Sequence, residues 1–187
     1  CDSNVPSALA AIERVYKAEN EKEKELLQSI EAEQSFRIRY AEAYSSTVGI
    51  KSLASTWKSK YGNVTVIIQN NKFKAIGEEV IILRTSLLDQ YANPYSKEPE
   101  KTKRIIEFSG TIVNRAIDYK LSILMVSPSR PDRSTRAYNL LSVLPDVGKR
   151  EDVYYGHMVV SLRDDEIFVM ERDSKSKLDF YSLLPLE

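Results

Sequence analysis

Apolar and polar residues follow two different periods along this chain, and the change from one to the other comes at Gly62. The stretch from Ser7 to Ser46 contains neither Gly nor Pro and is rich in Ala, Glu, Lys and Leu. These residue types lose little side-chain freedom in a helix, and apolar residues recur at helical spacing near both ends of the stretch. The pattern predicts one long helix, whose spaced apolar positions are Leu9, Ile12, Tyr16, Phe36, Tyr40 and Tyr44.

A second, shorter helix is predicted over Ile50–Tyr61. Leu53, Trp57 and Tyr61 would lie on one face of it, and Gly62 could supply the left-handed residue that ends it. We expect this apolar face to pack the helical part of the chain onto the part that follows. The predicted organisation of this half of the chain is a short tether, residues 1–6, and a helical stem, residues 7–61.

After Gly62 the alternation is that of β-strands. Ile106 and Phe108 share one parity, whereas from Ile117 the apolar residues occupy the other. A change of parity across only two polar residues is what a hairpin at Asn114-Arg115 would produce. Within the strand that follows, we expect Tyr119, Leu121 and Ile123 to face the core and Lys120 and Ser122 to face outward. The other predicted turns are Asn70-Asn71, Asp164-Asp165 and Asp173–Lys177.

Turns recurring about every ten residues favour an antiparallel meander. We therefore predict an α+β fold, with the helical stem followed by an antiparallel β sandwich or small barrel over residues 62–187. Roughly seven to nine strands are expected, one of them near Ala137–Val143. A long loop is expected over Ser86–Lys103, which contains two prolines and several charges.

Charge and composition narrow the class of function. Lys and Arg together number 27, and so do Asp and Glu, so the formal net charge is zero. A nucleic-acid-binding protein usually has a basic excess, because phosphate contacts dominate its affinity. We therefore expect no nucleic-acid partner. The hydrophobic fraction of 42% is that of a globular protein with a packed core.

The first two residues carry a resemblance to a known class of protein. Cys1 is the only cysteine in 187 residues, and Asp2 follows it. This start resembles a mature bacterial lipoprotein, a resemblance that covers only the first few residues. It implies acyl chains on Cys1, with the bilayer as a partner and the bacterial cell envelope as the location. In enterobacterial lipoproteins an aspartate after the cysteine favours retention at the inner membrane, so Asp2 favours its periplasmic face over the outer membrane.

No residue pattern indicates catalysis. His157 is the only histidine, and it falls on the polar parity of its predicted strand, where we expect a surface histidine rather than a catalytic base. One His and one Cys far apart in the sequence do not make a zinc site. Asp164, Asp165 and Glu166 cluster at a predicted hairpin tip, where solvated acids are ordinary turn residues. We expect neither an enzyme, nor a cofactor, nor a metal site.

Two loops indicate a binding surface instead. The loop around Pro128 and Pro131 carries three arginines, whose forked guanidinium groups suit carboxylates and phosphates. The loop Ser86–Lys103 carries two tyrosines, and Tyr and Arg are enriched at binding hot spots. If both loops lie at one end of the β domain, they form a single patch. The predicted binding residues are Tyr91, Tyr95, Arg130, Arg133 and Arg136.

The function that these observations favour is a membrane-tethered, non-catalytic binding or assembly module of the bacterial envelope. Its partner would be another envelope protein or an anionic envelope component. One alternative is a carrier that holds a lipid or other small apolar ligand, in a cavity of about 300 Å³ or more lined by inward-facing residues. A second alternative is a carboxylate-based hydrolase, which would need two buried acids facing one cleft.

Overall fold

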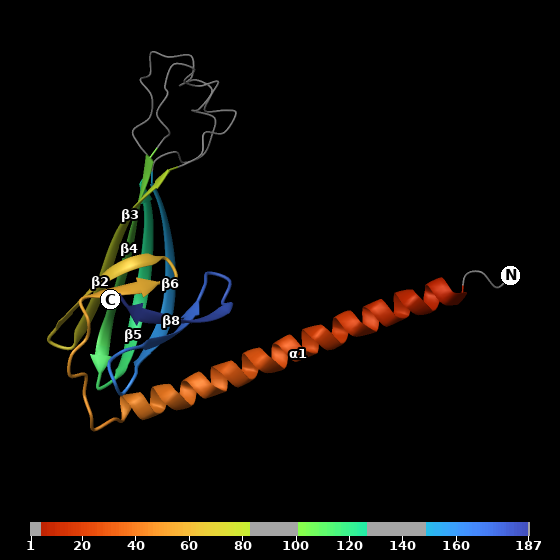
Figure 1. Ribbon diagram of the computed structural model, residues 1–187, viewed down its shortest axis with the longest axis horizontal. Helices are drawn as coiled ribbons and strands as arrows, with labels where there is room; N and C mark the ends of the chain where they lie inside the picture. The colour runs from red at the N-terminus through yellow and green to blue at the C-terminus, as the bar shows by residue number, and fades with distance from the viewer. Residues whose placement is uncertain (1–4, 83–100, 127–148, 187) are drawn as a thin grey trace, which may run out of the picture.

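A computed structural model of the protein describes residues 5–82, 101–126 and 149–186. It consists of one long N-terminal helix, α1 (Val5–Tyr44), and eight strands (Figure 1). The strands are β1 (Thr56–Ser59), β2 (Gly62–Gln69), β3 (Lys72–Ile82), β4 (Lys101–Val113), β5 (Ala116–Val126), β6 (Lys149–Val160), β7 (Ile167–Arg172) and β8 (Leu178–Pro185).

The eight strands form a closed antiparallel barrel in which each strand pairs with the next along the chain. Closure comes from pairing between β1 and β8, where Trp57 lies opposite Pro185 and Lys58 opposite Leu184. Of the two architectures that the sequence left open, the small barrel is therefore the one that forms. Where all eight strands pair, closure leaves no free sheet edge. Among the described residues, β3 beyond Ile76 and β6 before Tyr155 pair on one side only.

The predicted hairpin turns are confirmed. Asn70 (φ 49°) and Asn71 (φ 61°) join β2 to β3, and Asn114 (φ 55°) with Arg115 joins β4 to β5. Asparagine tolerates the positive φ that a tight two-residue hairpin requires. The turn that contains Asp164 and the turn over residues 173–177 also lie where the sequence predicted them.

The barrel interior is filled by side chains. The alternation predicted for β5 is confirmed, because Tyr119, Leu121 and Ile123 are buried while Lys120 is exposed. Ser122 is of intermediate exposure and donates to the side chain of Glu151 outside the core. Large side chains from across the barrel meet in the same core. In small barrels, inward side chains of this size fill the space inside the sheet. The fully buried members include Trp57, Phe73, Phe108, Ile117, Met158, Ile167 and Leu183.

The helix predicted over Ile50–Tyr61 is wrong. This segment instead forms β1 and the extended chain that leads to it, and Gly62 begins β2 rather than ending a helix. Trp57 is core, as expected, but it enters the barrel from a strand, and its indole nitrogen donates to the carbonyl of Ala54 at 2.8 Å. The reason is tertiary, since pairing with both β2 and β8 satisfies the backbone of β1.

The long predicted helix is confirmed as α1, a helix of 40 residues, which at 1.5 Å per residue extends about 60 Å. Only its C-terminal part packs on the barrel, where Phe36 and Ala43 are buried against the outward-facing Ala116, Val159 and Met170. The rest projects away from the barrel (Figure 1), and Ile12 in that part is 64% exposed. Among the described residues, no helix has the length and apolar character needed to span a bilayer.

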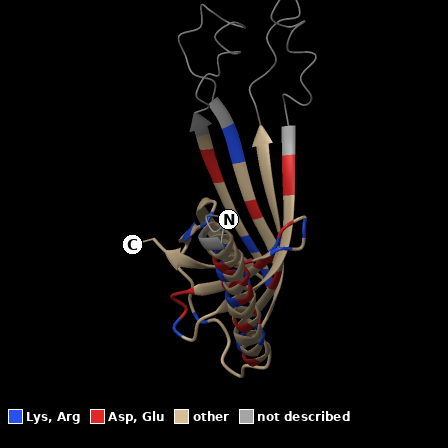
Figure 2. Ribbon diagram, turned by 90° about the vertical axis from the view of Figure 1, so that its right-hand side faces the viewer, with Lys and Arg blue, Asp and Glu red and all other residues tan. Residues whose placement is uncertain are grey.

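The two ends of the barrel differ. The four central strands, β3 to β6, are longer than the others and rise above them at the end drawn uppermost in Figure 1, here called the upper end. Charged residues of both signs lie along these rising strands (Figure 2). The turns after β1 and β7 also lie at the upper end. The opposite or lower end holds the C-terminus of α1 and the turns at residues 70–71, 114–115 and 161–166.

Candidate functional site

A buried carboxylate lies within the upper part of the barrel. Glu171 shares the inward parity of Ile167 and Val169 on β7 and is only 2% exposed. Its side chain accepts hydrogen bonds from the hydroxyl groups of Tyr119 at 2.8 Å and Tyr181 at 2.9 Å. The Tyr61 hydroxyl donates to its other oxygen. In the part of the chain that the structure describes, neutral hydroxyls rather than a lysine or arginine surround this charge.

Gly156 makes room for this arrangement. It lies on β6 between Tyr119 on one neighbouring strand and Glu171 on the other. A Cβ at this position would lie 2.7 Å from the Tyr119 hydroxyl oxygen and 2.4 Å from the carbonyl oxygen of Met170. Only glycine therefore lets the Tyr119 side chain cross β6 and reach the carboxylate of Glu171.

The three tyrosines remain neutral donors over the physiological pH range. Burial is the largest cause that raises the pKa of Tyr61, Tyr119 and Tyr181 above the ordinary value of about 10. The negative charge of Glu171 raises each of these pKa values further, because ionisation would place two negative charges side by side. The carboxylate thus keeps its hydrogen-bond donors.

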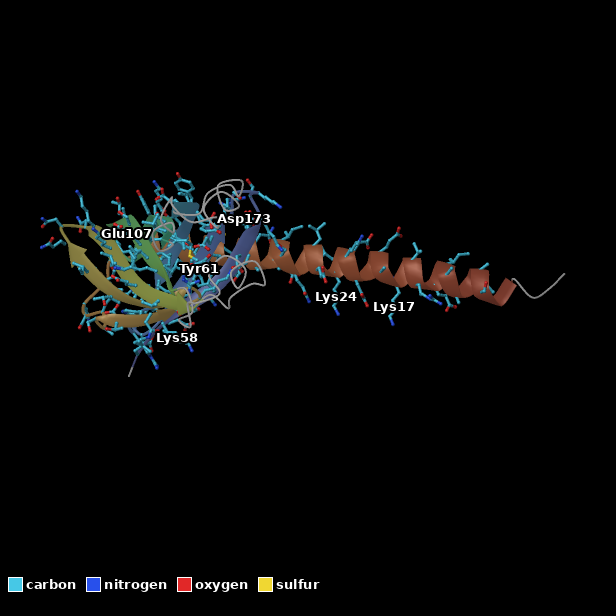
Figure 3. The ribbon with its side chains drawn as sticks, turned by 90° about the horizontal axis from the view of Figure 1, so that it is seen from above. Lys17, Lys24, Lys58, Tyr61, Glu107 and Asp173 are labelled. Carbon is cyan, nitrogen blue, oxygen red and sulfur yellow. The ribbon has the colours of Figure 1, made fainter. Side chains whose placement is uncertain are left out.

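Aromatic rings continue from this carboxylate toward solvent at the upper end. Tyr61 is stacked on Tyr154 with ring centroids 6.2 Å apart, and it meets Tyr181 edge to face at 6.1 Å. All three are partly buried, and Figure 3, seen from above, shows Tyr61 inside the outline of the barrel. We call Tyr61, Tyr119, Tyr154, Tyr181 and Glu171 the tyrosine–glutamate cluster.

Charged side chains border the cluster. Arg104 donates to Glu79 at 2.6 Å and to the backbone carbonyl of Tyr61, so it holds the β1–β2 turn against β3 and β4. The Nε of Arg104 is buried and has no hydrogen-bond partner among the described residues. Lys60 forms an ion pair with Asp179, and its ammonium nitrogen lies 5.5 Å from the ring centroid of Tyr61 and 5.8 Å from that of Tyr181.

The lower end is held by Arg115, which is 1% exposed although it lies in a hairpin turn. Its guanidinium donates to the carbonyls of Gly49 at 2.9 Å, Val160 at 3.1 Å and Ser161, and it forms an ion pair with Asp164. Its backbone nitrogen donates to the carbonyl of the helix residue Ala43 at 3.1 Å. The Arg115 side chain thus joins the β4–β5 turn, the chain that follows α1 and the turn that follows β6.

Asp164 is therefore not the ordinary solvated turn residue that the sequence suggested. Its side chain is 8% exposed and accepts hydrogen bonds from Arg115 and from the backbone nitrogens of Lys51 and Ser52. Burial by itself would raise its pKa, but these bonds to the charged form outweigh burial and hold the pKa below its usual value.

A pocket of about 470 Å³ opens at the lower end, between the 49–54 segment and the turns that close β2–β3 and β4–β5. Its apolar lining includes the inward-facing Val66, Ile68 and Ile112. The chain between α1 and β1 contributes Ile50 and Leu53.

His157 lies on the outer face of β6, as its parity predicted, and α1 partly covers it. Its Nδ1 lies 2.6 Å from a carboxylate oxygen of Asp118, which also accepts the Tyr40 hydroxyl at 2.6 Å. The Tyr40 and His157 rings meet edge to face, with their centroids 5.1 Å apart. These three side chains join the helix to the barrel wall.

The predicted site residues Cys1, Asp2, Tyr91, Tyr95, Arg130, Arg133 and Arg136, and the predicted strand near Ala137–Val143, lie outside the described residues. The described ends of the strands that flank the two predicted loops are neighbours, however. Ile82 lies opposite Lys101, and Val126 lies opposite Lys149 and Lys103, all at the upper end.

Sequence reasoning missed both Arg115 and the tyrosine–glutamate cluster. A signal for Glu171 was present, because it shares the parity of the apolar residues of β7. No comparable signal marked Arg115, whose burial depends on segments distant in the sequence. In comparisons with protein-family models, curated proteins and solved structures, no match to this chain was found.

Proposed function

We propose that this protein is a non-catalytic binding module, in which the helical stem α1 carries a barrel that binds a partner at its upper end. The single observation that supports this proposal most is the tyrosine–glutamate cluster, a group of buried and partly buried tyrosines around a buried carboxylate in the upper part of the barrel. Tyrosine is enriched at binding hot spots because its ring buries a large apolar area while its hydroxyl still finds a polar partner.

The arrangement of the buried acids weighs against hydrolysis. A carboxylate-based hydrolase needs two carboxyl groups facing one cleft, about 5 to 9.5 Å apart. Glu171 and Asp164, which burial removes from water, lie at opposite ends of the barrel. Asp164 is paired with an arginine, and Glu171 is surrounded by tyrosines whose raised pKa values keep them protonated at neutral pH, so that they offer no phenolate to act as a base.

The membrane tether is part of the same proposal and rests on the resemblance at Cys1 and Asp2. Acyl chains there would place the protein in the bacterial envelope, with α1 holding the barrel away from the bilayer. Mass spectrometry of the native protein, together with partitioning into detergent, tests this part. An unmodified thiol at Cys1 would remove the tether and the envelope location, and would leave the binding site untouched.

A photo-crosslinking amino acid at two adjacent positions tests the binding site. Tyr154 belongs to the cluster, whereas its neighbour Tyr155 faces outward and is 60% exposed. In cells of the native host, we expect specific crosslinked products from position 154 and few from position 155. Equal products from both positions, or products from 155 alone, would contradict a binding site at the upper end.

The lower pocket favours a second candidate, a carrier of a small apolar ligand. Its volume of about 470 Å³ exceeds the roughly 300 Å³ that small-molecule sites usually need, and three inward-facing residues line it. Replacing Ile112 with Trp should fill it. If the native protein co-purifies with a lipid that mass spectrometry detects, and the I112W variant does not, the carrier function is supported. Equal lipid content in both proteins removes it.

A further inference from the structure

The side chain of Lys60 lies against the tyrosine–glutamate cluster. Its ammonium nitrogen is within 6 Å of the ring centroids of both Tyr61 and Tyr181, the range in which a cation is attracted to the face of an aromatic ring. The Lys60 side chain is nevertheless about half exposed, at 48%. The carboxylate of Asp179 and the two rings thus hold an alkylammonium group at the upper end without burying it.

The carboxylate beneath the rings strengthens this attraction. The hydroxyls of Tyr61 and Tyr181 both donate to Glu171, and donation to an anion increases the electron density of a phenol ring. Glu171 is buried, so water screens its charge less than it would screen that of a surface carboxylate. A cation over these rings therefore interacts with both the ring faces and the charge behind them.

Two ion pairs beside the cluster also leave it favourable to a cation. Arg104 is paired with Glu79, and Lys60 is paired with Asp179. If Lys60 moves aside, Asp179 becomes available to a second ammonium, and Glu171 still has no cationic partner among the described residues. An incoming primary ammonium would thus find two ring faces and a carboxylate in the place that Lys60 now takes.

We propose that the upper end of the barrel binds a lysine side chain of a partner protein, which displaces Lys60 from the faces of Tyr61 and Tyr181. This inference rests on the proposed function and names the chemistry of its ligand. The fit of the chain's own lysine is the reason for choosing a lysine rather than a bulkier quaternary ammonium.

The probe is a short peptide, acetyl-Gly-Lys-Gly-amide, and its control is the same peptide with norleucine in place of lysine. The Lys60→Met variant keeps an aliphatic side chain and removes the competing charge. We expect it to bind the lysine peptide about tenfold more tightly than the wild type, as measured by NMR shifts of the tyrosine ring signals. The norleucine peptide should bind neither protein measurably.

Three further variants locate the effect. Lys58→Met removes an outward-facing lysine two residues away, at the margin of the barrel in Figure 3, and should leave binding at the wild-type level. Adding Tyr61→Leu to Lys60→Met should abolish the gain, because it removes a ring face. Adding Glu171→Gln instead should reduce the gain, because the charge behind the rings is lost. Circular dichroism confirms that each variant is folded.

Several results would overturn the inference. Equal affinity of wild type and Lys60→Met, a gain that survives Tyr61→Leu, or tighter binding of choline than of the lysine peptide would each remove a lysine as the ligand. These outcomes are separable from a failure of the proposed function. Crosslinks at position 154 with no lysine binding would leave a binding module with a different ligand, whereas their absence would remove the site itself.

Discussion

The two ends of the barrel each bury an ionised side chain, and they satisfy it in opposite ways. At the lower end Arg115 is neutralised by Asp164, and its remaining donors go to backbone carbonyls of neighbouring segments. At the upper end Glu171 accepts hydrogen bonds from neutral tyrosine hydroxyls and, among the described residues, from no lysine or arginine. The partly buried rings of Tyr61, Tyr154 and Tyr181 continue from it toward solvent. The lower arrangement joins parts of the chain to one another, whereas the upper one keeps a charge and aromatic surface available to something else.

This difference suggests that the buried charge at the lower end serves stability and the one at the upper end serves binding. Removing one partner of a buried pair is costly because the other charge stays buried without compensation. The lower end is therefore expected to dominate stability. The upper end is expected to dominate binding, because its charge is already satisfied by donors that do not cancel it.

The largest effect is expected from Arg115→Met, which keeps most of the side-chain volume and leaves Asp164 without its cation. The free energy of unfolding should fall by about 3 to 5 kcal/mol, measured by urea denaturation. Arg163, an exposed arginine in the turn between β6 and β7, provides the control. Its replacement by Met should change the free energy of unfolding little. A loss below about 1 kcal/mol for Arg115→Met would mean that the lower end does not hold the fold.

A smaller effect is expected from Gly156→Ala, which tests the upper end. The added methyl group would overlap the Tyr119 hydroxyl and the Met170 carbonyl, so the free energy of unfolding should fall by about 1 to 3 kcal/mol. Gly49 is the matched control at the lower end, because a Cβ there would have no atom within 4 Å. Equal stability of the two variants would show that Tyr119 does not need the space above Gly156.

The tyrosines of the upper end should make stability fall in alkali. Their folded pKa values are raised, so the folded state keeps protons that the unfolded chain begins to lose above about pH 10. Each such tyrosine should lower the free energy of unfolding by about 1.4 kcal/mol per pH unit above that point, with no effect below it. Tyr119→Phe should reduce this slope, and Tyr155→Phe, on the exposed face, should not. An unchanged slope in Tyr119→Phe would contradict the raised pKa of Tyr119.

The smallest effect on stability is expected from Lys60→Met. Its ion pair with Asp179 is half exposed, and exposed pairs contribute about 0 to 1 kcal/mol. The thermal midpoint should therefore stay within a few degrees of the wild-type value, even though lysine-peptide binding changes. A large loss of stability would place Lys60 among the residues that hold the barrel, and the two ends would no longer differ in the way described.

Features whose physical causes are local can be predicted from the residues alone. The run without Gly or Pro predicts α1, because helix propensity depends on each residue and its near neighbours. Asn70-Asn71 and Asn114 predict their hairpins, because positive φ is a property of single residues. The parity of Tyr119, Leu121 and Ile123 predicts their burial, because side chains alternate along any strand.

Other features depend on contacts between residues far apart in the chain, and these could not be predicted. The Trp57 segment has apolar residues at helical spacing, yet its pairing with β2 and β8 makes it a strand. Arg115 lies in a turn where an exposed side chain is expected, yet it is buried because the chain after α1 and the turn after β6 meet around it. The tyrosine–glutamate cluster joins β1–β2, β5, β6, β7 and β8. The tyrosine hydroxyls reach the Glu171 carboxylate only when the barrel has formed, because their strands are far apart in the sequence. No local pattern of residues predicts these hydrogen bonds.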